Sequence, residues 1–163
     1  MPIYVSLSME GAEMPNCDVH WKTGAAVGGG YAGYLAWGQP ISHVLTETAC
    51  GVLGGTIGGL LPDWIDAPTR PRHRAEAHSI AISGTCGYYL KDQIHSWQSS
   101  LRDKAGAYAQ RRRASQEPLA QLWFGLWEFI LRFVAGATAG LLGGYASHLT
   151  LDSLTPAYLP ILC

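Results

Sequence analysis

The chain has 163 residues and a formal net charge of −1, which suits one domain and excludes a strongly basic nucleic-acid-binding protein. Charged residues make up 14%, well below the roughly 25% of soluble proteins, while 20 glycines, six tryptophans and eight tyrosines are present. This composition is typical of closely packed membrane helices with interfacial anchors, although the mean hydropathy is only +0.07.

The N-terminal half predicts an arm followed by two apolar helices. Residues 1–19 are mixed and polar and read as an irregular arm, with acidic side chains and no basic region of a signal peptide. An apolar run with closely spaced small residues follows over 24–37, and Gly38-Gln39-Pro40 predicts a turn. A second run over 41–61 is long enough to cross a bilayer, since about 20 residues suffice.

The C-terminal half predicts two further helices. Two prolines bound a loop over 60–68, and a short apolar helix follows over 80–90. It can extend as an amphipathic helix through His95 and Trp97, whereas the polar segment 99–118 is expected to be a solvated helix or loop. The last run, 119–151, is long enough to span a membrane.

Strand-like alternation is nearly absent, so the predicted fold is all-α, a compact bundle of glycine-rich, closely packed apolar helices embedded in or associated with a membrane. Residues 20–163 are expected to form one domain, with 99–118 as a polar connecting segment. Glu128 and Arg132 stand four residues apart, which suits an ion pair within the last helix. Basic residues cluster in both 70–74 and 102–113, and this leaves the membrane topology open.

His148 and Asp152 are the most informative pair in the sequence. On a helix their spacing of four places an imidazole and a carboxylate one turn apart on one face, where both can bind one ion. Ionisable groups among leucines need a partner because a lone charge in apolar surroundings costs several kcal/mol or more. The alternative interpretation is a His–Asp hydrogen bond that joins two helices.

Other metal-capable residues also stand at the ends of apolar runs: His20, Asp63, Asp66, His73 and His78. Histidine and aspartate together form a mixed nitrogen and oxygen site that accepts zinc, manganese or iron. The four cysteines are scattered without a C-x-x-C pair, so neither a disulfide framework nor a thiolate zinc finger is expected. The constellation therefore predicts a divalent metal, with zinc as first choice, bound as one or two ions; Asp152 is the candidate for a bridging carboxylate.

Three segments carry a family resemblance: Leu60-Leu61-Pro62-Asp63, His73-Arg74-x-x-x-His78-Ser79 and Ser147-His148-x-x-x-Asp152. In this order they resemble the YdjM-like family, described as LexA-regulated, membrane-bound metal-dependent hydrolases. The order is also similar to that of the all-helical zinc-dependent phospholipase C and P1-nuclease superfamily. The resemblance implies metal ligands at His20, Asp63, His78, His148 and Asp152, and a bacterial-type inner (cytoplasmic) membrane location. The family motif reads Leu-Pro-Asp-x-Asp, whereas two residues separate Asp63 from Asp66 here, so either carboxylate can be the ligand.

The remaining candidates suggest catalytic roles. Asp66 can orient a ligand histidine or cap a helix, His73 can shuttle protons or be a solvated loop residue, and Arg74 can stabilise an oxyanion. The predicted function is a membrane-associated metal-dependent hydrolase that acts on a phosphoester or another ester, with membrane lipid as a partner. The alternative is a non-enzymatic membrane module, such as a homo-oligomeric pore or effector, in which the same cluster is structural.

Overall fold

The computed structural model describes residues 17–65 and 80–154, and these residues form helices without any strand. The helices are α1 (Cys17–Leu35), α2 (Ile41–Ile65), α3 (Ile80–Ala114) and α4 (Pro118–Leu154). The predicted all-α fold is therefore confirmed for this part of the chain.

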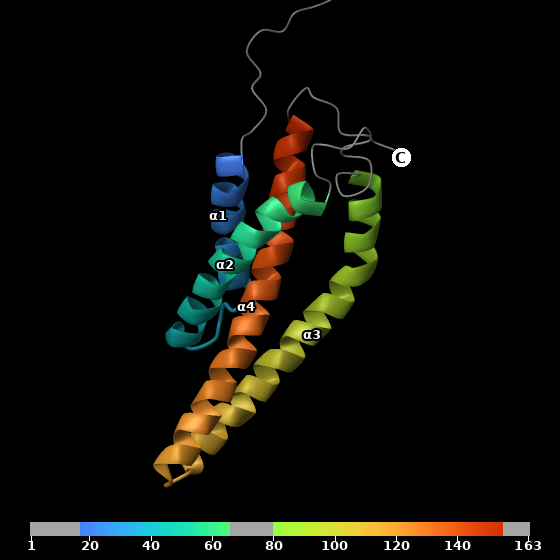
Figure 1. Ribbon diagram of the computed structural model, residues 1–163. Coiled ribbons are helices and arrows are strands. Elements are labelled where there is room, and N and C mark those ends of the chain that lie inside the picture. Colours follow the sequence, from blue (N-terminus) through green and yellow to red (C-terminus); the bar gives the residue numbers. More distant parts are fainter. Residues whose placement is uncertain (1–16, 66–79, 155–163) are drawn as a thin grey trace, which may run out of the picture.

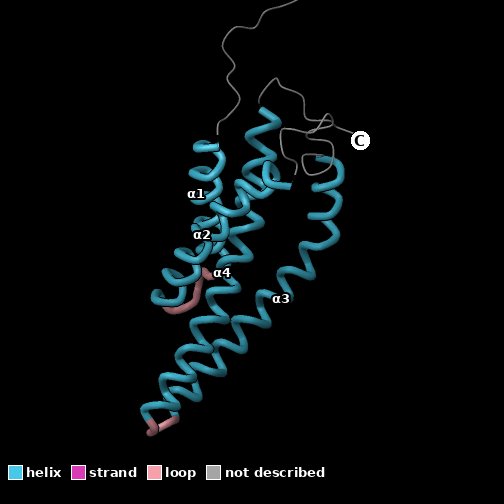
Figure 2. Tube along the Cα trace, in the orientation of Figure 1, coloured by secondary structure: helices cyan, strands magenta, loops and turns pink. Residues whose placement is uncertain are grey.

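Successive helices run in opposite directions, so the starts of α1 and α3 lie at the same end as the last turns of α2 and α4 (Figure 1). Helices α1, α2 and α4 pack against one another, and α3 packs against α4. Figure 2 shows that the backbone of α3 lies beside the first half of α4 and separates from it toward the other end.

Two short turns reverse the chain where the sequence contains turn residues (Figure 2). Gly38 adopts a φ of 87°, which glycine tolerates without a steric penalty, and the carbonyl of Pro40 accepts the first hydrogen bonds of α2. Before α4, the Glu117 carbonyl accepts from Gln121 N, and Pro118 occupies the first helical position, where its missing N–H costs nothing. The predicted turn at residues 38–40 is confirmed.

Small residues allow α1, α2 and α4 to approach one another closely. A Cβ atom added to Gly55 would collide with Gly24 and Gly28 of α1, and one added to Gly144 would collide with Gly55. One turn earlier on α4, a Cβ atom added to Gly140 would likewise collide with the backbone of Gly51. These contacts show that the glycines of the last helix admit a neighbouring helix, as expected for closely packed, glycine-rich helices.

The helix boundaries differ from the sequence prediction in three places. Helix α1 begins at Cys17, so the last residues assigned to the irregular arm are helical. Helix α2 continues through Pro62 to Ile65, because a proline one turn from a helix end removes a single internal hydrogen bond. Helix α3 includes the segment expected to be polar and solvated, and on it Leu101, Ala105 and Ala109 are buried.

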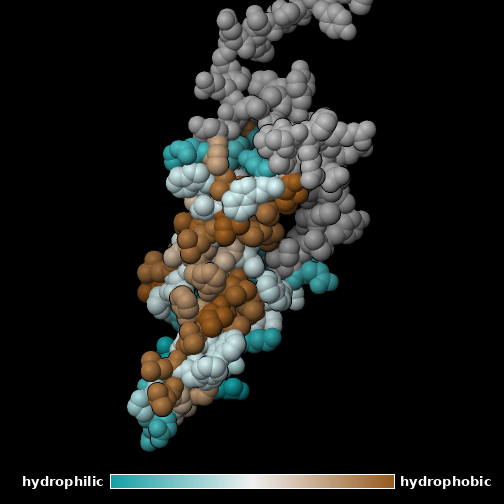
Figure 3. Space-filling view, in the orientation of Figure 1, coloured by the Kyte–Doolittle hydropathy of each residue, from teal (hydrophilic) through white to brown (hydrophobic). Residues whose placement is uncertain are grey.

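Large apolar side chains are exposed along the outer surface, among them Leu45, Leu53, Leu122, Trp123 and Phe129. In the space-filling view of Figure 3, most hydrophobic residues gather in the middle of the molecule, with hydrophilic residues toward both ends. Within the described residues, α2 and the stretch Pro118–Asp152 are long and apolar enough to cross a membrane.

Candidate metal centre

The candidate metal centre begins with two residues near the end of α4. His148 and Asp152 are both buried, and Nε2 of His148 lies 3.4 Å from Oδ2 of Asp152. The helical spacing of four residues does place the imidazole and the carboxylate on one face, as the sequence predicted. A buried carboxylate of this kind requires a positive partner.

A backbone contact from α2 determines the orientation of the His148 ring. Nδ1 of His148 lies 2.6 Å from the carbonyl oxygen of Gly59. Because a carbonyl can only accept, Nδ1 carries the proton and donates it, and Nε2 faces the carboxylates. Histidines that bind metals in proteins usually donate their second ring nitrogen to a backbone carbonyl or carboxylate in this way.

Helix α2 also contributes a second carboxylate. Oδ1 of Asp63 lies 3.7 Å from Nε2 of His148, and the Asp63 side chain is 38% exposed, unlike that of its buried neighbours. Asp63 occupies the last helical turn, beyond Pro62. The continuation of α2 past this proline therefore brings the carboxylate to the end of α4.

Helix α1 contributes the second imidazole. Nε2 of His20 lies 3.4 Å from Oδ1 of Asp152, and the His20 side chain is buried. Its ring stacks on that of His148, with centroids 3.9 Å apart and an interplanar angle of 25°. Two charged imidazoles stacked this closely would repel each other strongly, so the arrangement favours at least one neutral ring. The close approach of the His20 backbone to Gly59 positions this residue.

The donor set fits a divalent ion. One ligand atom from each of His20, His148 and Asp152 can be chosen so that all lie within 4.8 Å of one another. Two atoms bound to the same tetrahedral zinc at about 2.0–2.1 Å lie about 3.3 Å apart, close to the separations of 3.4 Å from each imidazole to Asp152. The two Asp152 oxygens face different histidines, an arrangement compatible with one ion or with a bridging carboxylate.

The structure thus brings together four of the residues predicted from the sequence: His20, Asp63, His148 and Asp152. We call these four residues the metal centre. The other predicted ligand, His78, and the predicted catalytic residues Asp66, His73 and Arg74 lie outside the residues that the structure describes. Of the two carboxylates that could be the ligand, the structure describes only Asp63, and it lies adjacent to His148.

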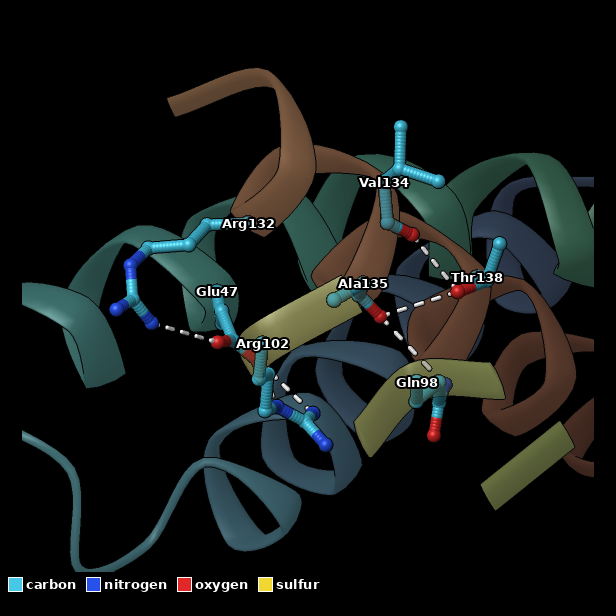
Figure 4. Close-up of polar contacts among 7 residues, drawn as sticks. All are labelled: Glu47, Gln98, Arg102, Arg132, Val134, Ala135 and Thr138. Carbon is cyan, nitrogen blue, oxygen red and sulfur yellow. Dashed lines mark hydrogen bonds and ion pairs between the residues drawn. The ribbon is translucent and has the colours of Figure 1, made fainter. Parts of the chain in front are cut away.

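A second cluster of ionisable side chains occupies the middle of the bundle. The carboxylate of Glu47 on α2 is fully buried and lies between two guanidinium groups. Oε2 accepts from Nε of Arg102 on α3 at 2.8 Å, and Oε1 lies 3.4 Å from Nη1 of Arg132 on α4 (Figure 4). In a separate set of contacts, Gln98 Nε2 donates to the carbonyl of Ala135 at 3.5 Å (Figure 4).

The cluster continues along α4 to Glu128. Its Oε1 lies 3.2 Å from Nε2 of His43 and 3.7 Å from Nε of Arg132, and its Oε2 lies 3.2 Å from Nη2 of Arg112. The ion pair predicted between Glu128 and Arg132 is therefore confirmed. We call the connected residues the arginine network: His43, Glu47, Arg102, Arg112, Glu128 and Arg132.

Sequence reasoning missed most of the arginine network. No sequence motif pairs His43 with another residue, and the segment 99–118 was expected to be a solvated helix or loop, although Arg102 is largely buried. A signal was nevertheless present: Leu101, Ala105 and Ala109 recur every four residues and mark the face of α3 that packs on the bundle.

A scan of the chain against protein-family models finds no match, and searches of curated proteins and of solved structures find no significant relative. The resemblance to the YdjM-like family therefore stays a prediction from the sequence motifs.

Proposed function

We propose that this protein is a membrane-associated, metal-dependent hydrolase, with zinc as the first choice of metal and manganese or iron as alternatives. Its proposed ligands are His20, Asp63, His148 and Asp152, together with His78, which lies outside the described residues, and its substrate is a phosphoester or another ester. The motif resemblance to the YdjM-like family supports this proposal and suggests a bacterial-type inner membrane as the location.

The observation that carries the proposal is that Nε2 of His148 lies close to carboxylate oxygens of both Asp63 and Asp152. Because Nδ1 donates to Gly59, Nε2 is the ring nitrogen that lies toward carboxylate oxygens of Asp152 and Asp63. Such atoms approach one another in a buried place only when a cation lies between them, either a proton or a metal ion. A divalent ion also satisfies His20, which faces the other oxygen of Asp152.

A divalent ion held there supplies Lewis acidity and makes water nucleophilic near neutral pH. The chain's own residues do the rest: the Gly59 carbonyl holds His148 in the ligating tautomer, and the packed ends of α1, α2 and α4 exclude bulk water from Asp152. In this proposal Asp66 orients a ligand histidine, His73 moves a proton and Arg74 stabilises an oxyanion. The exposed edge of the metal centre at Asp63 is where substrate approaches.

Two observations support membrane association. Helices α2 and α4 are long and apolar enough to cross a bilayer, and their exposed surfaces carry leucine, tryptophan and phenylalanine side chains. Within these helices Glu47, Glu128 and Arg132 face the bundle interior, where they pair with one another. Intramembrane charges in proteins are placed in the same way.

The test measures bound metal and hydrolysis on the same samples. The full chain is purified in a non-ionic detergent, loaded with zinc, desalted and analysed by plasma mass spectrometry; chromogenic phosphodiesters and carboxylic esters report activity. We expect about one or two zinc ions per wild-type chain. His148→Ala and Asp152→Asn should lose both metal and hydrolysis while retaining helical circular dichroism. His95→Ala is the matched control, because His95 is an exposed histidine whose described polar contact is with Tyr31 at 3.5 Å.

Each outcome is informative. A wild-type chain that retains no metal would overturn the proposal. A chain that binds metal through His148 and Asp152 but hydrolyses neither class of ester would favour the second candidate, a non-enzymatic membrane module with a structural ion. The observation that favours this candidate is the burial of His20, His148 and Asp152, because structural metal sites are closed whereas catalytic sites keep an open position.

A further inference from the structure

Two hollows adjoin each other at the end of the bundle that is remote from the metal centre. The first, which we call the polar cavity after six of its side chains, is an open hollow of about 210 Å³ lined by Ser42, His43, Thr46, Arg112, Glu128 and Arg132, with Gly125 and Phe129 completing its wall. The second is an open groove of about 690 Å³ along the start of α4, with Pro118, Leu122 and Leu126 in its wall. Arg112 and Gly125 line both, so the polar cavity and the more apolar groove meet at these two residues.

The charges of the arginine network do not balance. Three guanidinium groups, those of Arg102, Arg112 and Arg132, face the carboxylates of Glu47 and Glu128. With a neutral His43, one positive charge is left over. Asp103 lines a separate hollow with Arg102 and Arg132, and its neighbour Lys104 carries the opposite charge; both side chains are exposed. A guanidinium has five N–H donors, and the described ion pairs of Arg112 and Arg132 leave donors for a further anion.

His43 adds a polar atom without a partner. Its Nε2 lies 3.2 Å from a Glu128 oxygen, and a carboxylate accepts, so Nε2 is the protonated nitrogen. Nδ1 of the same ring is buried and has no hydrogen-bond partner. In the neutral ring this nitrogen is an acceptor, which suits a hydroxyl group of a ligand that enters the cavity.

We propose that this pair of hollows binds one anionic phospholipid. Its phosphate lies in the polar cavity against Arg112 and Arg132, a headgroup hydroxyl reaches Nδ1 of His43, and an acyl chain follows the groove past Leu122 and Leu126. Arginine suits this role because its fork of donors matches phosphate oxygens. The site shares no residue with the metal centre and does not depend on hydrolase activity.

The groove is what distinguishes a phospholipid from a free phosphate ion. A phosphate ion would need only the polar cavity, whereas the structure continues it into a larger apolar-walled groove beside exposed Leu119 and Trp123. Arg112 stands at the junction, is 45% exposed and is thus accessible to a headgroup from outside. Tryptophan and arginine beside leucine are typical of the headgroup level of a bilayer.

The test counts lipid bound to the delipidated full chain in non-ionic detergent. Native mass spectrometry follows a titration with dihexanoylphosphatidylglycerol, which carries an anionic phosphate and headgroup hydroxyls. We expect saturable binding of one lipid per chain. Arg112→Gln should weaken it about tenfold, the typical value of one charge-assisted contact to phosphate. Arg113→Gln removes the same charge from the neighbouring exposed residue, which lines neither hollow, and should change the affinity less than about twofold.

A second variant tests the groove without changing any charge. A Cβ at Gly125 would meet only the flexible Arg112 side chain, so Gly125→Leu should fold and fill the junction between the hollows, and lipid binding should be lost.

Equal losses for Arg112→Gln and Arg113→Gln would overturn the proposal in favour of diffuse charge attraction. Inorganic phosphate that competes as well as the lipid, or unchanged lipid binding by Gly125→Leu, would overturn the acyl-chain groove and hence the phospholipid. Equal binding of dihexanoylphosphatidylcholine would overturn the requirement for an anionic lipid.

Discussion

The metal centre and the arginine network show opposite ways of burying charge in one small bundle. In the metal centre two carboxylates face two imidazoles, and with neutral rings these groups carry a formal charge of −2 that a divalent cation would cancel. In the arginine network guanidinium groups outnumber carboxylates, and the carboxylates already have cationic partners from the chain. Under the proposed function a cation from outside would complete the first cluster, whereas the carboxylates of the second are paired with arginines of the chain itself.

This difference follows from the residue types. Arginine keeps its charge at any physiological pH, so the buried Glu47 has permanent cationic partners within the chain. Histidine is neutral or charged according to its surroundings, so a His–Asp cluster can exchange a proton for a metal ion. The network should therefore determine folding, and the metal centre should determine ligand-dependent stability.

The largest effect is expected from breaking the arginine network. Glu47→Gln removes the carboxylate that pairs with Arg102 and Arg132 and leaves two buried guanidinium groups facing an amide. Loss of one partner from a buried ion pair costs about 3–5 kcal/mol, so the free energy of unfolding in detergent should fall by that amount. Metal content should survive in the fraction that folds. Glu117→Gln, an exposed residue before α4, is the control. A loss below about 1 kcal/mol would mean that the network contributes no more than a surface pair.

The sequence predicted interactions within a helix better than interactions between helices. Pairs four residues apart, such as His148–Asp152 and Glu128–Arg132, follow from helical periodicity alone. The contact between Glu47 and Arg102 spans 55 residues and depends on which faces of α2 and α3 meet, which no local pattern specifies. The position of His20 beside an apolar run and its order in a family motif made it a candidate ligand, but no local pattern placed it next to Asp152.

The glycines explain why packing was also difficult to predict. Their spacing indicated close helix contacts, but not that Gly59 would lie against the backbone of His20 and at the same time accept a hydrogen bond from His148. The burial of one face of the segment 99–118 was difficult to predict for a related reason. That face is made mostly of alanine, which gives only a weak hydrophobic pattern in the sequence.

A smaller effect on stability is expected from removing metal, and this experiment tests the metal centre rather than the arginine network. At a free zinc concentration a hundred times the dissociation constant, binding stabilises the native state by about 2.7 kcal/mol. A chelator should therefore lower the unfolding free energy of the wild-type chain by about that amount and leave Asp152→Asn unchanged. Glu47→Gln should still respond to the chelator, because its metal centre is intact. Equal responses of wild type and Asp152→Asn would show that zinc binds elsewhere.

The smallest effect is expected from a single methyl group at the metal centre, and it connects helix packing to metal affinity. A Cβ at Gly59 would collide with the His20 carbonyl, so Gly59→Ala must push α1 away from α2. Overpacking of this kind costs about 1–3 kcal/mol. Zinc affinity, measured by competition with a fluorescent chelator, should fall as well because His20 moves with α1. Gly30→Ala is the matched control: nothing lies within 4 Å of its added Cβ, so it should keep zinc affinity and gain slightly in stability through helix propensity. If Gly59→Ala lost stability but kept full zinc affinity, His20 would not be a ligand, and the described ligands would come from α2 and α4 alone.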